Sequence, residues 1–134
     1  MKNIKNGILI VSHPDDECLF ASSILDKVST LIICFENLPF ENKITFGRKN
    51  STKNYPLKKL TLINLCLSQA NKSFIPNNWF SIKDDCYGIR GGYKEKSYRR
   101  NFKTLLFELR KYIPPNSTLI SHNPWGEYGH EEHC

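Results

Sequence analysis

Several features of familiar protein classes are absent from this sequence of 134 residues. It has no C-x-x-C pair, and its five cysteines are an odd number, so neither a redox motif nor a complete disulfide framework is expected. The apolar run at residues 7–12 is too short for a signal peptide, and no longer run could cross a membrane. We therefore expect a soluble, cytoplasmic protein with reduced thiols and no transmembrane segment.

The charge of the chain says little about its partners. The formal net charge is +6, and its one local concentration lies between Lys94 and Arg100. Such a patch suits either a phosphate group or a solvated face. No nucleic-acid-binding module accompanies it, so we expect no nucleic-acid partner.

The first third of the chain predicts the fold. A length of 134 residues with 40% hydrophobic content suits a single domain over residues 1–134. Residues 4–12 and 30–35 read as strands buried on both faces, and residues 16–27 between them as a helix that Asp15 caps. This order predicts an α/β fold, a three-layer, Rossmann-like, doubly wound domain around a mostly parallel sheet.

The remaining elements are predicted from spacing and turn residues. The polar stretch 36–55 reads as a long loop bordering a site. Leucines at helical spacing predict helices over residues 57–70 and 97–112. A short strand is expected at 79–82, and a further strand at 117–121, which leads into His122.

Two polar segments follow predicted strands and carry the types of side chain that bind metals. These are His13-Pro14-Asp15-Asp16-Glu17 and Gly129-His130-Glu131-Glu132-His133. Open α/β sheets form their binding sites beyond the carboxyl ends of their strands. Catalytic zinc is bound by three imidazole or carboxylate groups, and its fourth coordination position stays open for water. Each segment alone has a simpler interpretation, helix capping for the Asp-Asp pair and surface decoration for His-x-x-His. Their shared position favours a site.

The first segment resembles the signature of the PIG-L/LmbE deacetylases, and Gly126-Glu127-Tyr128-Gly129-His130-Glu131-Glu132-His133 resembles their downstream motif. The resemblance implies a zinc-dependent amide hydrolase that holds Zn²⁺ through His13, Asp16 and His133. It also implies Asp15 as the general base for a metal-bound water that acts as nucleophile. His130 would stabilise the oxyanion and protonate the amine, and Tyr128 would polarise the same oxygen.

The resemblance implies a small-molecule substrate, an N-acetylglucosamine-type sugar conjugate from which an N-acetyl group is hydrolysed. Arg90 is a candidate to bind a phosphate or sugar hydroxyl of that substrate. His122 either lines the same pocket or is a structural, hydrogen-bonding histidine. Which conjugate is bound stays open.

The identity of the metal and the completeness of the domain also stay open. The same ligands accept Fe²⁺ or cobalt as well as zinc, and the oligomeric state is not readable. Glu132 replaces the family's usual aspartate, and it is expected, like Glu17, to orient a ligand or to be a cap or solvated group. The sequence stops at Cys134, directly after His133. We therefore expect a C-terminally incomplete domain, for which a truncated, non-catalytic sugar- or metal-binding relative is the second possible function.

Overall fold

The computed structural model describes residues 4–39, 41–70, 95–123 and 131–133. Four strands form one sheet in the order β3-β2-β1-β4, and every neighbouring pair is parallel. The strands are β1 (Gly7–Val11), β2 (Thr30–Asn37), β3 (Thr61–Ser68) and β4 (Thr118–Ile120). The prediction of an α/β fold around a parallel sheet is therefore confirmed for these residues.

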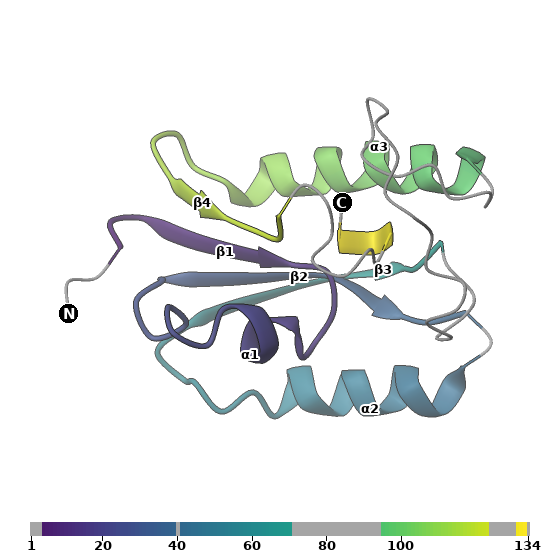
Figure 1. Ribbon diagram of the computed structural model, residues 1–134, viewed down its shortest axis with the longest axis horizontal. Helices are drawn as coiled ribbons and strands as arrows, with labels where there is room; N and C mark the ends of the chain where they lie inside the picture. The colour runs from purple at the N-terminus through teal and green to yellow at the C-terminus, as the bar shows by residue number, and fades with distance from the viewer. Residues whose placement is uncertain (1–3, 40, 71–94, 124–130, 134) are drawn as a thin grey trace.

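Helices cover both faces of the sheet (Figure 1). α1 (Asp16–Phe20) and α2 (Asn42–Lys53) lie on one side, and α3 (Glu95–Tyr112) lies on the other. A short 3₁₀ turn, η2 (Glu131–His133), lies just beyond the end of β1. None of these helices is long and apolar enough to cross a membrane, within the part of the chain that the structure describes.

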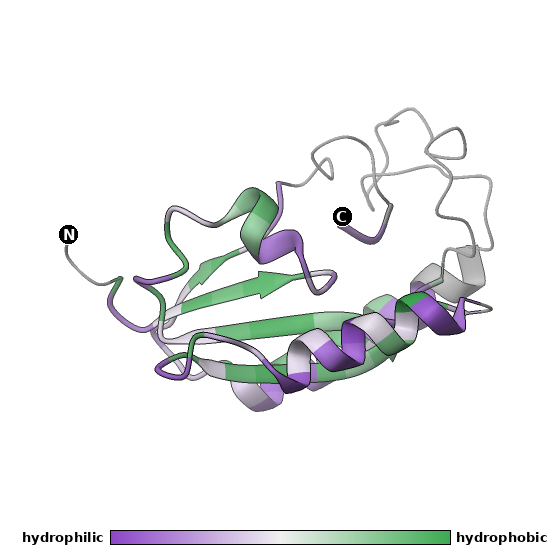
Figure 2. Ribbon diagram, turned by 90° about the horizontal axis from the view of Figure 1, so that it is seen from below, coloured by the Kyte–Doolittle hydropathy of each residue, from purple (hydrophilic) through white to green (hydrophobic). Residues whose placement is uncertain are grey.

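The core lies between the sheet and the α1 side. The fully buried apolar side chains of the described residues belong to β1 and β2. Successive side chains of a strand point to opposite faces, so every second one faces the core. Figure 2 shows the strands as the most hydrophobic part of the chain, whereas α2 is mostly polar. The core cluster consists of Leu9, Val11, Ala21, Val28, Leu31 and Ile33. By contrast, no α3 side chain from Arg99 to Tyr112 is fully buried.

Two predicted elements were wrong. Residues 36–55 are not a long loop, because β2 continues to Asn37 and α2 follows it. Residues 57–70 are not a helix, because Thr61–Ser68 forms the edge strand β3, from which Leu62 packs against the core. Leucine spacing alone does not separate the two periods over so short a run.

Other boundaries differ from those predicted. α1 ends at Phe20 instead of reaching Lys27, and the segment after it continues in turns that still bury Ala21 and Val28. The helix predicted over 97–112 is confirmed as α3, and the strand predicted over 117–121 as β4. The strand expected at 79–82 lies outside the described residues.

Candidate metal centre

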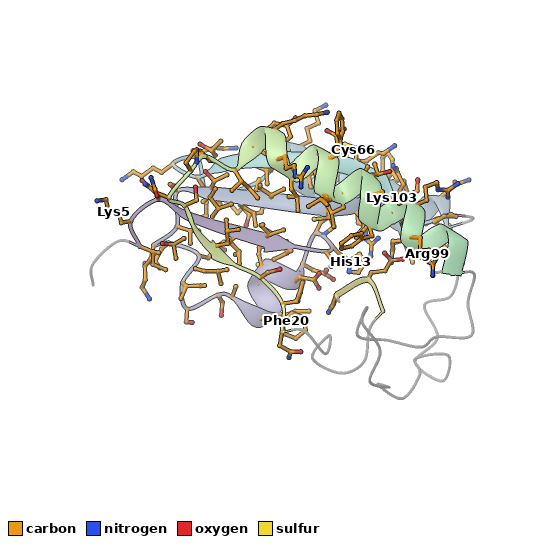
Figure 3. All side chains as sticks on the ribbon, turned by 90° about the horizontal axis from the view of Figure 1, so that it is seen from above. Lys5, His13, Phe20, Cys66, Arg99 and Lys103 are labelled. Atoms are coloured by element: carbon orange, nitrogen blue, oxygen red, sulfur yellow. The ribbon has the colours of Figure 1, made fainter. Side chains whose placement is uncertain are left out.

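Three potential ligands from distant parts of the chain meet at the carboxyl end of the sheet. His13 lies just after β1, Asp16 begins α1, and His133 ends η2. All three are buried, with exposed fractions of 3%, 2% and 5%. Figure 3 shows His13 at this end of the sheet, beyond the carboxyl ends of the central strands. The sequence prediction that these residues converge agrees with their positions.

The ligand atoms form a nearly equilateral triangle. Nδ1 of His13 lies 3.3 Å from Oδ2 of Asp16, and Nε2 of His133 lies 3.4 Å from the same oxygen. The two ring nitrogens are 3.3 Å apart. Tetrahedral zinc with bonds of about 2.0–2.1 Å separates neighbouring ligand atoms by roughly 3.3 Å. The donor set and its spacing therefore fit a metal ion of this type, although they do not identify the element.

A backbone hydrogen bond orients the carboxylate of Asp16 toward the other two candidate ligands. The N–H of His13 donates to Oδ2 of Asp16 over 2.7 Å. A carboxylate oxygen has two lone pairs, so this hydrogen bond orients the group and leaves a second lone pair for the triangle. The contacts between His13 and Asp16, three positions apart, thus orient two of the three candidate ligands without His133.

Protonation states also suit a metal. Burial, the largest influence, lowers the pKa of His13 to about 4, so its imidazole is neutral at pH 7. Burial acts to raise the pKa of Asp16, but the neighbouring histidines His122 and His13 hold that pKa well below its usual range. A neutral imidazole and an ionised carboxylate are the forms that bind metals.

His122 stands beside the triangle without completing it. Its Nε2 atom accepts the N–H of Ser12 over 3.2 Å and lies 3.3 Å from Oδ2 of Asp16. Its ring stacks on that of His133, with centroids 4.0 Å apart and an interplanar angle of 15°. The lone pair of Nε2 already accepts the N–H of Ser12 and is therefore not offered to the triangle. With a side chain only 3% exposed, His122 fits the structural, hydrogen-bonding role better than that of lining a substrate pocket.

Asp15 has an unusual backbone and a perturbed carboxyl group. Its φ of 133° lies in a region that residues other than glycine rarely adopt, and its N–H donates to Oε2 of Glu17 over 3.0 Å. Burial and then the charge of Asp16 raise the pKa of Asp15 to about 6. Asp15 occupies the N-cap position of α1, as predicted, but its side chain makes no capping hydrogen bond. Strain of this kind concentrates at functional sites.

Two residues near the site do not stand out in the sequence. Arg48 of α2 is only 8% exposed, and its Nη1 donates to Oε1 of Gln69 over 2.6 Å. Phe20 is 41% exposed and meets the rings of His122 and His133 nearly edge to face. The polar neighbours of Arg48 in the sequence give no signal of burial. The apolar pattern places Phe20 on one face of a longer helix, and the short α1 instead leaves it at the site.

The remaining predicted site residues lie outside the described part of the chain. These are Arg90, Tyr128 and His130. Of the two glutamates expected to orient neighbouring groups, Glu17 is buried and accepts the N–H of Asp15, and Glu132 is buried beside His133. The assignments of Arg90, Tyr128 and His130 therefore stay predictions.

No protein-family model, no curated protein and no solved structure matches this chain.

Proposed function

We propose that this chain is a zinc-dependent N-deacetylase of the PIG-L/LmbE type, acting on an N-acetylglucosamine-type sugar conjugate. The observation that carries the proposal is the buried triangle of His13, Asp16 and His133. Its members are the residues that the resemblance to the family selects as zinc ligands. The strand order β3-β2-β1-β4 supports a Rossmann-like domain, because doubly wound sheets begin with that order.

The chain's own groups divide the work of amide hydrolysis. Zinc, when bound by the triangle, would supply Lewis-acid polarisation and lower the pKa of a coordinated water. The resemblance gives Asp15 the role of general base, which accepts the proton of the attacking water, and its carboxyl group is not part of the triangle. His130 and Tyr128 are proposed, from the resemblance alone, to stabilise the oxyanion and to protonate the departing amine.

The surroundings of the triangle support binding of a sugar. Phe20 offers a partly exposed aromatic ring beside His122 and His133. The C–H face of a pyranose packs on such a ring, which would orient an N-acetyl group toward the buried ligands. Arg90 is retained as a proposed partner for a phosphate or hydroxyl of the conjugate.

The decisive first experiment is the metal content of the protein purified without added zinc. We expect about one zinc per chain, as three protein ligands define one ion, and loss of that zinc in an Asp16→Ala, His133→Ala double variant. Acetate release from N-acetylglucosaminyl conjugates is then measured for the wild type and for Asp15→Asn. Negligible metal in both proteins would contradict the proposal. Zinc binding without acetate release from any conjugate would favour the non-catalytic binding relative.

A further inference from the structure

The turn that carries His133 is tied to the ends of two strands. Oγ of Ser12, just after β1, donates to the backbone oxygen of Glu132 over 2.5 Å. The N–H of Ala70, just after β3, donates to Oε1 of Glu132 over 2.6 Å. Glu132 is only 8% exposed. One residue therefore joins η2 to both strand ends, through its backbone and through its side chain.

The donor at Ala70 is itself held in place. The N–H of Gln69 donates to the backbone oxygen of Asn37 over 2.9 Å, which extends the pairing of β3 with β2. The side chain of Gln69 is 5% exposed and accepts the hydrogen bond from Arg48. Because these contacts fix the residue before it through both backbone and side chain, the N–H of Ala70 is a rigid attachment point for η2.

We propose that Glu132 is a positioning residue for the metal ligand His133. His133 follows it directly in the chain, so a shift of η2 moves the Nε2 atom relative to His13 and Asp16. Those two ligands are fixed by local contacts, and His133 depends on η2 reaching the strand ends. The inference rests on the metal centre of the proposed function and not on the substrate or the reaction.

The hydrogen bond between Ala70 and Glu132 requires an acceptor oxygen at the right distance. It does not require that the acceptor carry a negative charge. A backbone N–H is neutral, and a glutamine carries an oxygen at the position of Oε1. Aspartate keeps the charge but is one methylene shorter, so its oxygen falls short of the N–H of Ala70. The resemblance to the PIG-L/LmbE family makes aspartate the usual residue at this position. Restoring that residue is therefore expected to harm this particular site.

The experiment measures the zinc dissociation constant of the full chain by competition with a chromogenic chelator. Glu132→Ala and Glu132→Asp are expected to weaken zinc binding by about 10- to 100-fold, the usual cost of losing a partner outside the ligand set. Glu132→Gln is expected to stay within about fivefold of the wild type, since it exchanges a charged acceptor for a neutral one. The Co²⁺ absorption spectrum should be altered in Glu132→Ala and retained in Glu132→Gln.

Glu36 provides a matched control, because it is another buried glutamate that accepts side-chain hydrogen bonds. Its Oε1 accepts from Oγ1 of Thr52 over 2.9 Å and from Nδ2 of Asn64 over 2.5 Å. Glu36→Ala should lower the thermal midpoint of the metal-free protein. It should leave the zinc affinity of the folded protein within about threefold of the wild type, since these hydrogen bonds join β2 to α2 and β3 and do not reach η2.

Two results would overturn the role of Glu132 alone. One is a Glu132→Ala protein that binds zinc as tightly as the wild type, and the other is a Glu132→Gln protein as weak as Glu132→Ala. A wild-type chain that binds no zinc would overturn the metal centre and this role together. Because Glu132→Asp and Glu132→Gln change so little volume, the test holds even where Glu132→Ala fails to fold.

Discussion

Nε2 of His133 lies 3.3 Å from Nδ1 of His13, across a separation of 120 residues in the chain. The two ring nitrogens and Oδ2 of Asp16 are all atoms with lone pairs that a metal ion can share. A cation at the centre of the triangle would satisfy all three. Such a cation would join the segment after β1 to η2, 120 residues further along the chain.

Removal of metal should lower the stability of the protein. A ligand present at about 1,000 times its dissociation constant stabilises the folded state by about 4 kcal/mol. For a domain of 134 residues, we expect a chelator to lower Tm by about 15 °C. Differential scanning calorimetry with and without zinc measures this shift. The Asp16→Ala variant is the control, and its Tm should not respond to zinc.

Replacing His122 should separate positioning from ligation. His122→Phe keeps a flat ring on His133 and removes the nitrogen that accepts the N–H of Ser12. We expect zinc affinity to fall by about tenfold, as for other groups that only orient a ligand. Equilibrium competition with a chelator measures the change. Complete loss of zinc, equal to that of His133→Ala, would instead make His122 a ligand.

Asp15 is expected to lower the stability of the fold and to be needed for catalysis. Asp15→Gly relieves the φ of 133° and should raise the free energy of unfolding by about 1 kcal/mol, after the entropic cost of glycine is deducted. Asp15→Asn keeps the shape without a base and should lower kcat by about 10²- to 10⁴-fold. Zinc content should match the wild type in both variants. Unchanged kcat in Asp15→Asn would remove the general-base assignment.

Acid should destabilise the metal-free protein through His13. Its pKa falls from 6.5 to about 4 on folding, so the unfolded chain takes up a proton first as the pH is lowered. The stability due to neutral His13 is full above pH 6.5 and is lost as the pH falls toward 4, by about 3 kcal/mol. The stability due to ionised Asp16, whose pKa is lowered on folding, is full above its ordinary pKa of 3.8 and is lost only at still lower pH. Urea unfolding at successive pH values measures the loss, which His13→Gln should abolish.

Phe20 should affect substrate binding more than catalysis. Phe20→Ala removes the ring beside His122 and should raise KM for an N-acetylglucosaminyl conjugate by about tenfold, the value of one aromatic contact. The kcat and the zinc affinity should stay near those of the wild type. A simple N-acetylated amine that lacks a sugar serves as the control substrate, and its KM should not change. Equal effects on both substrates would argue against contact with the sugar.

The sequence predicts the fold best where burial is continuous. β1 and β2 are apolar on both faces, and such runs have few other structural solutions. It does not predict α2, whose mostly polar residues include Arg48 and Thr52 and give no apolar stripe. That helix is held by polar contacts, such as Thr52 with Glu36, which involve partners far away in the sequence.

The convergence of the candidate ligands was predictable because they lie in two short motifs that follow predicted strands. His13 and Asp16 are three residues apart, so local geometry brings them together. The attachment of η2 was not predictable, since it depends on the backbone N–H of Ala70, and the side chain of alanine gives no sign of this role. The N–H is in place to bind Glu132 only when β3 has formed. The leucine spacing of the edge strand β3 predicts a helix instead, so the sequence does not indicate where this strand ends.

The place of β1 inside the sheet has a consequence for synthesis. Its neighbours are β2, which follows soon after it, and β4, which pairs Gly7 with Thr118. While the ribosome is still making the segment between them, one hydrogen-bonding edge of a strongly apolar strand has no strand to pair with. Such an edge attracts strands of other nascent chains. The three residues of β4 therefore cover an apolar edge that stays open until late in synthesis.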